Sequence, residues 1–169
     1  SVPIIKDIIR AYRIPILEVA GYEADDVIGT LATEAGKQGI KTYMMTPDKD
    51  YGQLVTDNVF MYRPKYGDKE FEVMGVEEIK AKFDIQSPAQ VIDMLGLMGD
   101  SADNIPGCPG VGEKTAQKLV AQFGSIENLL AHTDELKGAI KTKVESNKEK
   151  IEFSKFLATI KVDVPITLN

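Results

Sequence analysis

The stretch GDSADNIPGCPGVGEKTA, residues 99–116, decides how this chain is organised. Its first part carries two carboxylates, Asp100 and Asp103, whereas its second part is rich in glycine and leads to Lys114. Glycines allow the backbone to approach a ligand closely, and the unpaired N–H groups of a following helix form a natural seat for a phosphate oxygen. One short stretch therefore combines a candidate cation site with a candidate anion site.

Upstream of this stretch, helical and strand patterns alternate, which predicts an α/β fold with a parallel sheet. The expected helices are residues 3–12 and 23–38, the expected strands are 14–20 (IPILEVA) and 41–46 (KTYMMT), and two shorter strands, 59–64 and 71–75, form a hairpin around the turn 65–70. A parallel sheet usually has more central strands than these two. We therefore expect a core that lacks its leading strand and a chain that is a piece of a larger domain.

Downstream of residue 75 the strand patterns disappear and helical patterns replace them. The expected helices are residues 76–83, 88–99, 114–123, 125–132 and about 141–160. We predict two parts, a partial α/β core over residues 1–75 and a helical subdomain over residues 76–169. For the glycine turn within residues 105–120, the alternative to a phosphate seat is a plain helix-turn-helix corner whose glycines serve tight turning.

Acidic residues follow each of the two predicted central strands. Glu23, Asp25 and Asp26 come after residues 14–20, and Asp48 and Asp50 come after residues 41–46. Functional groups of an open parallel sheet gather beyond the carboxyl ends of its strands, so we expect the two clusters to share one crevice. The alternative is local: acids favour the first turn of a helix, and Asp48 is a suitable helix cap.

Asp100 and Asp103 are three residues apart, which predicts that they share one side of a helical turn at the end of an apolar helix. With the two upstream clusters they make seven carboxylates, which would repel one another strongly unless divalent cations lay among them. Oxygen ligands without histidine or cysteine favour Mg²⁺ or Mn²⁺. This donor set suits a two-metal phosphodiesterase, in which ions about 4 Å apart activate a water and stabilise the departing oxygen.

Several other functions are excluded by the residues present. From Asp48, Gln53 and Val59 occupy the positions where a calcium-binding EF-hand needs glycine and glutamate. A P-loop fails because Glu113 interrupts its Gly-Lys-Thr, and one cysteine with one histidine makes neither a disulfide nor a zinc site. The net charge of −6 argues against coating nucleic acid by bulk electrostatics, and no apolar run is long enough to span a membrane.

Three acidic motifs and the glycine turn, taken in order, resemble a known family. The strings EADD, DKDYGQLV and GDSADNIPGCPGVGEKTA are closely similar to those of the 5′-nuclease domains of bacterial DNA polymerases I, relatives of flap endonucleases with a PIN-like core. The resemblance spans nearly the whole chain and implies that seven acids belong to the metal site: Glu23, Asp25, Asp26, Asp48, Asp50, Asp100 and Asp103.

The same resemblance implies that the glycine turn is a helix-hairpin-helix that grips the backbone of duplex DNA, in this family often with K⁺. The implied DNA contacts are Gly107, Gly110, Val111, Gly112, Lys114 and Thr115. The implied partners are DNA with a 5′ flap, a nick or an RNA primer, with a polymerase domain downstream, in the bacterial cytoplasm at the nucleoid. The implied activity is that of a magnesium-dependent 5′–3′ exonuclease and flap endonuclease acting in replication and repair.

Further acids and a basic arch precede the matching region in this family, so we expect the isolated chain to have little or no nuclease activity. The alternatives left open are a non-catalytic duplex-binding module whose acids are solvated helix caps, and a metal-sensing or interaction domain that does not bind nucleic acid.

Overall fold

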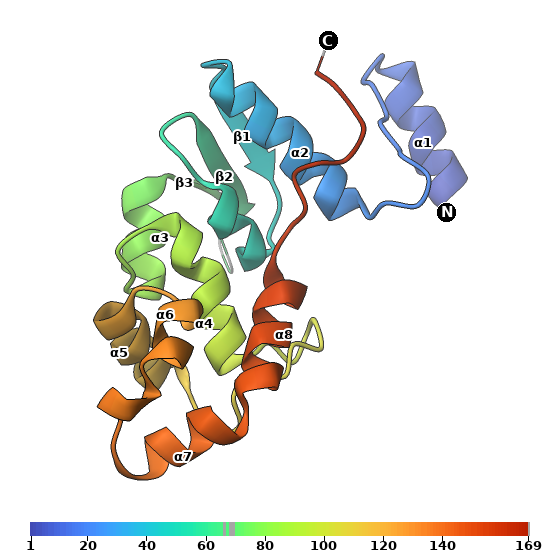
Figure 1. Cartoon of the computed structure of the whole chain (residues 1–169). Helices are drawn as coiled ribbons and strands as arrows, with labels where there is room; N and C mark the ends of the chain where they lie inside the picture. Colours follow the sequence, from blue (N-terminus) through green and yellow to red (C-terminus); the bar gives the residue numbers. More distant parts are fainter. Residues whose placement is uncertain (66, 68–69, 169) are drawn as a thin grey trace.

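The computed structural model describes residues 1–65, 67 and 70–168. Within them lies a sheet of three strands in the order β1-β2-β3 (Figure 1). Strand β1 (Thr42–Met45) runs parallel to β2 (Val59–Pro64), and β3 (Phe71–Met74) pairs antiparallel with β2. The predicted hairpin is thus confirmed as a pair of strands, whereas three residues of its predicted turn, 66, 68 and 69, lie outside the described residues.

The two faces of the sheet differ because side chains alternate along each strand. Met44, Val59, Met61 and Met74 point into the core and are at most 6% exposed. The opposite face carries a row of aromatic side chains from all three strands, in which Tyr62 stacks on Phe71 with the ring centroids 4.8 Å apart. Helix α2 (Ala24–Lys37) packs against the sheet. After this helix the chain changes direction toward β1 at Gly39, which has a φ of +79°.

Residues 14–20 do not form the predicted strand. They have no regular secondary structure, and Ile14 and Leu17 are each 55% exposed. The apolar pattern predicts a buried strand, but this segment does not pair with β1 or with any other strand of the described sheet. A strand needs such a partner for its backbone hydrogen bonds, so the prediction is wrong here. Helix α1 (Val2–Ala11) precedes this segment as predicted, and it lies to one side of the molecule with none of its residues buried (Figure 1).

The second part of the chain is helical, as predicted. It contains α3 (Val76–Phe83), α4 (Val91–Met98), α5 (Glu113–Phe123), α6 (Ile126–Ala131), α7 (Gly138–Ser146) and α8 (Lys148–Ala158), with short 3₁₀ turns η2 (Pro88–Gln90) and η3 (Thr133–Glu135). The single helix expected over residues 141–160 is instead two helices. The chain leaves the helical conformation at Asn147, whose side chain donates to the Lys143 carbonyl at 2.7 Å.

Helix α4 is the centre of the core, and its neighbours pack closely around it. Met94, Leu95 and Leu97 are at most 1% exposed, and Gly96 lets α6 and α8 approach the α4 backbone. Lys155 of α8 reaches Asp93 of α4 at 2.6 Å and Glu127 of α6 at 2.8 Å. Burial alone would lower the pKa of Lys155, but these two partners raise it, so the lysine stays charged and links the three helices.

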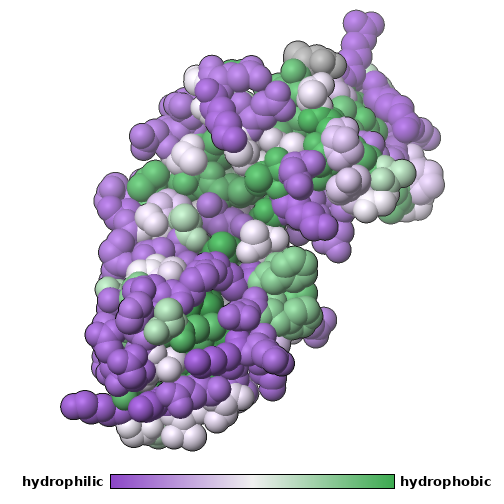
Figure 2. Space-filling model, in the orientation of Figure 1, coloured by the Kyte–Doolittle hydropathy of each residue, from purple (hydrophilic) through white to green (hydrophobic). Residues whose placement is uncertain are grey.

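Hydrophilic side chains cover most of the helical part on the face shown in Figure 2, and hydrophobic side chains gather over α1 and α2. The exposed apolar residues of α1 include Val2, Ile5 and Ile8. Among the described residues, no helix is both long and apolar enough to cross a bilayer.

A close contact between two glycines shapes the chain after α4. Gly99 ends this helix with a φ of +74°, and Gly107 lies against it with a φ of +65°. A Cβ on Gly107 would lie 2.4 Å from the Gly99 nitrogen, so only glycine fits there. The intervening residues form a loop closed by two backbone hydrogen bonds of 2.8 Å between Asp100 and Ile105.

We expect Gly107→Ala to lower the free energy of unfolding by about 3 kcal/mol or more, because it combines a backbone clash with strain at positive φ. Gly39→Ala is the matched control, since Gly39 has a similar φ of +79° but no atom within 4 Å of its added Cβ. That control should cost about 1 kcal/mol. Urea unfolding of both variants makes the comparison, and equal losses would show that the contact contributes nothing.

Candidate metal centre and DNA-backbone interface

Three carboxylates converge at the end of β1. Asp48, Asp50 and Asp103 each place an oxygen atom within 4.8 Å of the other two, although Asp103 is more than fifty residues away in the chain. Asp48 and Asp50 flank the start of η1 (Lys49–Leu54), and Asp103 lies in the loop that follows α4. As expected from sequence, acids from separate segments lie close together, and this holds for these three side chains.

Local hydrogen bonds direct the two acids of η1. The Thr46 hydroxyl accepts from the Asp48 N–H at 3.2 Å, and the Asp48 carboxylate accepts from the Asp50 N–H at 3.0 Å. Asp48 is therefore the cap of a short helix, the local role considered from sequence, while it also belongs to the cluster. This turn directs Asp50 inward, where the residue is only 9% exposed.

One carboxyl oxygen of Asp50 has no hydrogen-bond donor among the described residues. This oxygen, Oδ1, is buried. Burial raises the pKa of Asp50 to about 8, with Asp103 and Asp48 adding to the effect, and burial likewise raises the pKa of Asp48. A buried carboxylate oxygen with no donor, beside two further carboxylates, fits a divalent cation of the Mg²⁺ or Mn²⁺ type.

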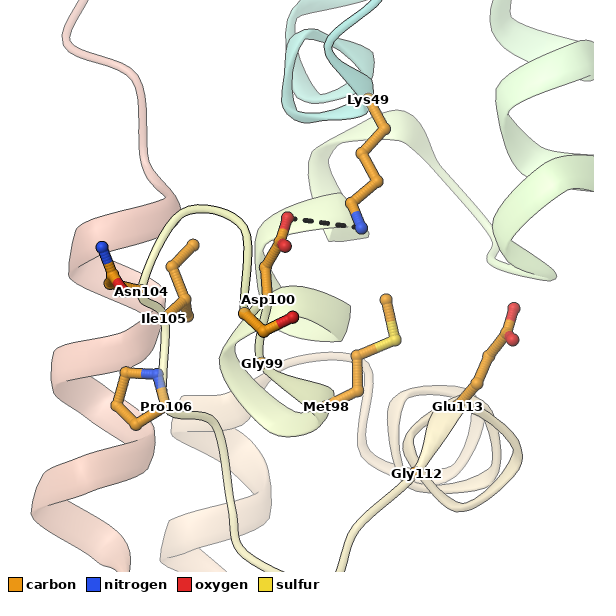
Figure 3. A pocket seen from close by; sticks show the side chains of 10 residues that line it. Lys49, Met98, Gly99, Asp100, Asn104, Ile105, Pro106, Gly112 and Glu113 are labelled. Carbon is orange, nitrogen blue, oxygen red and sulfur yellow. Dashed lines mark ion pairs between the residues drawn. The ribbon is translucent and has the colours of Figure 1, made fainter. Parts of the chain in front are cut away.

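Asp100 lies apart from these three acids. Residues 99–105 form the closed loop instead of the predicted helical turn, because Gly99 ends α4 and Asn104 takes a φ of +56°. Asp100 and Asp103 consequently do not share one helical face. The Asp100 carboxylate contacts the Lys49 ammonium at 3.3 Å in a cavity of about 760 Å³ that extends to Gly112 and Glu113 of the glycine turn (Figure 3).

The remaining acids line a second cavity of about 590 Å³ together with Asp50 and Asp103. Asp25 accepts a 2.7 Å hydrogen bond from the Tyr51 hydroxyl. Burial is the larger cause of the raised pKa of Tyr51, and this hydrogen bond is the second. Asp26 accepts from the backbone N–H of Lys161 at 2.9 Å. Glu23, Asp25 and Asp26 thus lie at the start of α2, as the local alternative has it, and they also border the acidic cavity.

The glycine turn divides into buried and exposed residues. The Gly107 N–H donates to the Ser154 hydroxyl at 2.9 Å, and the Val111 N–H donates to the Cys108 carbonyl at 3.0 Å. These two N–H groups are therefore used within the fold. Gly110 is exposed, has a φ of +82°, and its carbonyl accepts from Lys143 at 3.3 Å.

The start of α5 faces solvent. Gly112 is exposed and stands at the N-cap position, where it has no side chain that could accept from the first-turn N–H groups. In the first turn, Lys114 is exposed and Thr115 is half-buried. Unpaired N–H groups beside an exposed lysine are suited to a phosphate oxygen. Of the residues named for DNA contact, Gly110, Gly112, Lys114 and Thr115 lie at this end of the helix.

Three features of the site were not predicted from sequence. Tyr51 positions Asp25, Lys49 pairs with Asp100, and residues 156–161 form a wall of the acidic cavity. Lys49 stands between two of the predicted ligands, so its position in DKD was a usable signal. The wall formed by residues 156–161 has no local signal, because it depends on where α8 ends.

Solved structures show which known proteins share this fold. A T5 5′-exonuclease with bound divalent zinc ions superposes with a TM-score of 0.78 at 20% identity, over 90% of this chain and 56% of that one. The catalytic core of Rad2 gives a TM-score of 0.55 at 17% identity, over 99% of this chain and 53% of that one. The predicted fold class, a PIN-like α/β nuclease core followed by a helical part, is confirmed.

Sequence relatives give the family. Residues 1–84 match the 5′-3′ exonuclease N-terminal resolvase-like domain, and residues 86–169 match the 5′-3′ exonuclease C-terminal SAM fold. DNA polymerase I of Bacillus subtilis is 47% identical over all of this chain and 19% of its own length, and a 5′-3′ exonuclease of Aquifex aeolicus is 38% identical over all of this chain and 56% of its own. The chain belongs to the 5′-3′ exonuclease family. It spans about a fifth of the length of the polymerases that it matches.

The raised pKa of Asp50 predicts how stability depends on pH. In the unfolded chain Asp50 ionises near pH 4, whereas in the folded, metal-free chain it keeps its proton to about pH 8. Its contribution to the free energy of unfolding is therefore lost as the pH rises from about 4 to about 8. Asp50→Asn should flatten this part of the pH profile, and the exposed acid control Asp134→Asn should not.

Chemical unfolding at a series of pH values in the presence of EDTA measures the effect. We expect a divalent ion to displace the proton of Asp50, so Mn²⁺ should raise the melting temperature more at pH 8 than at pH 6. An unchanged profile in Asp50→Asn would mean that Asp50 is not protonated in the folded chain.

Proposed function

We propose that this chain forms the acidic centre and a DNA-backbone grip of a metal-dependent 5′–3′ exonuclease and flap endonuclease. The observation that supports this proposal best is the buried, unpartnered Asp50 oxygen beside Asp48 and Asp103, in a chain of the 5′-3′ exonuclease family. The seven acids named from sequence divide into different roles around it.

Asp48, Asp50 and Asp103 are the residues that would hold the cations directly, because their oxygens already lie within 4.8 Å of one another. Such cations supply an activated water and neutralise charge on the departing oxygen of a phosphodiester. Glu23, Asp25 and Asp26 border the same cavity and would act through water molecules, which Mg²⁺ retains in most protein sites. Tyr51 holds Asp25 toward this cavity.

The turn before α5 would hold a duplex some distance from the acids. Gly110 and Gly112 allow close approach of a phosphate, the first-turn N–H groups of α5 point at it, and Lys114 adds charge. Contacts of this kind position a nucleic acid without reading its sequence. The distance between grip and acids would therefore set which phosphodiester bond is cut.

The specific assignments are part of the same proposal. Mg²⁺ or Mn²⁺ is the catalytic cation, in two or more copies, and K⁺ assists the turn. The substrates are DNA with a 5′ flap, a nick or an RNA primer in the bacterial cytoplasm at the nucleoid, and a polymerase domain follows in the intact protein. These assignments fit an all-oxygen donor set and the DNA polymerase I relatives.

Cleavage is tested in a chimera in which this chain replaces the matching segment of the Bacillus subtilis DNA polymerase I. We expect the chimera to cut a 5′-flap DNA with Mg²⁺, and Asp50→Asn or Asp103→Asn to lower kcat by about 100-fold or more, since each removes a cation ligand. The control Asp134→Asn should retain full activity. A chimera that binds flap DNA but never cuts it would favour the non-catalytic duplex-binding module.

The DNA grip has its own test in the 169-residue chain. We expect Lys114→Ala to weaken binding to duplexes of unrelated sequence to the same degree and to lower the salt slope of the affinity by about 1. Lys37→Ala, an exposed lysine at the far end of α2, is the control. Fluorescence anisotropy at several salt concentrations measures both slopes, and an unchanged slope in Lys114→Ala would remove this residue from the interface.

A further inference from the structure

Lys49 is the basic residue at the acidic centre. In sequence it stands between Asp48 and Asp50, and its side chain lies in the neighbouring cavity, where it points toward Asp100 (Figure 3). There its ammonium group lies 3.3 Å from the Asp100 carboxylate. The Asp100 side chain is only 7% exposed, whereas the Lys49 side chain is 39% exposed.

The surrounding charge makes this pair unlike an ordinary surface ion pair. Within the described part of the chain, Lys49 is the basic side chain that pairs with one of the seven acids. The Asp100 charge also contributes to raising the pKa of both Asp48 and Asp50, after the larger effect of burial. Asp100 is therefore close enough to Asp48 and Asp50 to repel their charges.

A lysine and a divalent ion would compete for Asp100. The ammonium group donates up to three hydrogen bonds but is a single positive charge, and a divalent ion beside it would repel it while attracting the same carboxylate. Lys49 has a flexible four-carbon stem and a half-exposed end, so it can move from Asp100 into the open part of the cavity without disturbing η1.

We propose that Lys49 is a positioning residue of the metal centre: it is the internal counter-ion of Asp100 in the metal-free chain, and a divalent ion displaces it. This inference rests on the proposed metal-dependent function. Lys49 then stabilises the acids before the metal arrives and weakens metal binding by competition. A lysine that merely held Asp100 in place for the metal would have the opposite effect on affinity.

The first measurement is the affinity of the full chain for Mn²⁺, with free Mn²⁺ measured by electron paramagnetic resonance. Lys49→Met keeps the unbranched side chain up to its fourth heavy atom and removes the charged group, and it should bind Mn²⁺ about fivefold more tightly than the wild type. Lys49→Arg keeps the charge and should bind no more tightly than the wild type. Lys80→Met is the matched control, because Lys80 forms a pair of similar length, 3.4 Å, with exposed Glu77.

The second measurement separates competition at Asp100 from a general change in charge. If Lys49 acts through Asp100, Lys49→Met should have little effect on Mn²⁺ affinity in an Asp100→Asn background. If it acts only through the overall field, the same fivefold tightening will appear there. Added Mg²⁺ should also shift the side-chain NMR signal of Lys49, and this shift should be lost in Asp100→Asn.

The stability of the metal-free chain gives a third readout. Lys49→Met should lower the melting temperature in EDTA by about 2 to 4 °C, because it leaves the Asp100 carboxylate without a counter-ion and with only the Ala102 N–H as hydrogen-bond donor, and Asp100→Asn should restore the loss. This effect and the tighter Mn²⁺ binding must occur in the same variant.

The outcomes distinguish this inference from the proposed function. Wild-type chain that binds Mn²⁺ together with a Lys49→Met variant of equal or weaker affinity would overturn the role of Lys49 and leave the metal-dependent function standing. Wild-type chain that binds no Mn²⁺ at all would overturn both. Tightening that persists undiminished in Asp100→Asn would also overturn the competition at Asp100.

Discussion

The close packing of Gly99 against Gly107 is the constraint on which the functional part of this structure depends. It ends α4, closes the loop of residues 99–105 with two hydrogen bonds between Asp100 and Ile105, and starts the turn that leads to α5. One backbone contact thereby fixes both the acids of the loop and the exposed start of α5. The loop that carries Asp100 and Asp103 and the turn that leads to α5 are therefore joined at this contact.

In the acidic centre, carboxylates that repel one another are held in place by hydrogen bonds from the surrounding fold. Asp50 is buried where a charge is costly, and its pKa of about 8 reflects this cost. Asp48 caps η1, Tyr51 holds Asp25, and the Lys161 N–H holds Asp26, so each of these three acids has at least one oxygen bound to the fold. The strained arrangement of charges is a usual feature of sites evolved for a ligand rather than for stability.

Much of the fold and part of the site could be predicted from sequence. Helical and strand periodicity identified α2, β1 and the β2–β3 pair, because these patterns are local. Residues 14–20 were mistaken for a strand because an apolar run does not reveal whether a neighbouring strand is there to pair with it. The single helix expected over residues 141–160 failed at Asn147, where a side-chain hydrogen bond to the backbone competes with the helix.

The site was predictable to the extent that it depends on residue type. An all-oxygen set of acids indicated the kind of cation, and their positions after β1 and after α4 indicated that they could meet. The spacing of Asp100 and Asp103 was misread because a helical turn was assumed where positive φ angles at Gly99 and Asn104 form a loop. The two separate cavities follow from that loop and from no local pattern, and the pairing of Lys49 with Asp100 depends on the same loop.

The segment after α8 has a consequence for the order of folding. The Lys161 N–H binds Asp26 and the Val164 N–H binds the Thr30 hydroxyl, so α2 is fastened by residues about 135 positions further along the chain. Such distant contacts close a long loop and form late, because their entropy must be overcome before they add stability. On the ribosome, α2 must therefore wait for residues 161–164 to emerge before these two hydrogen bonds can form.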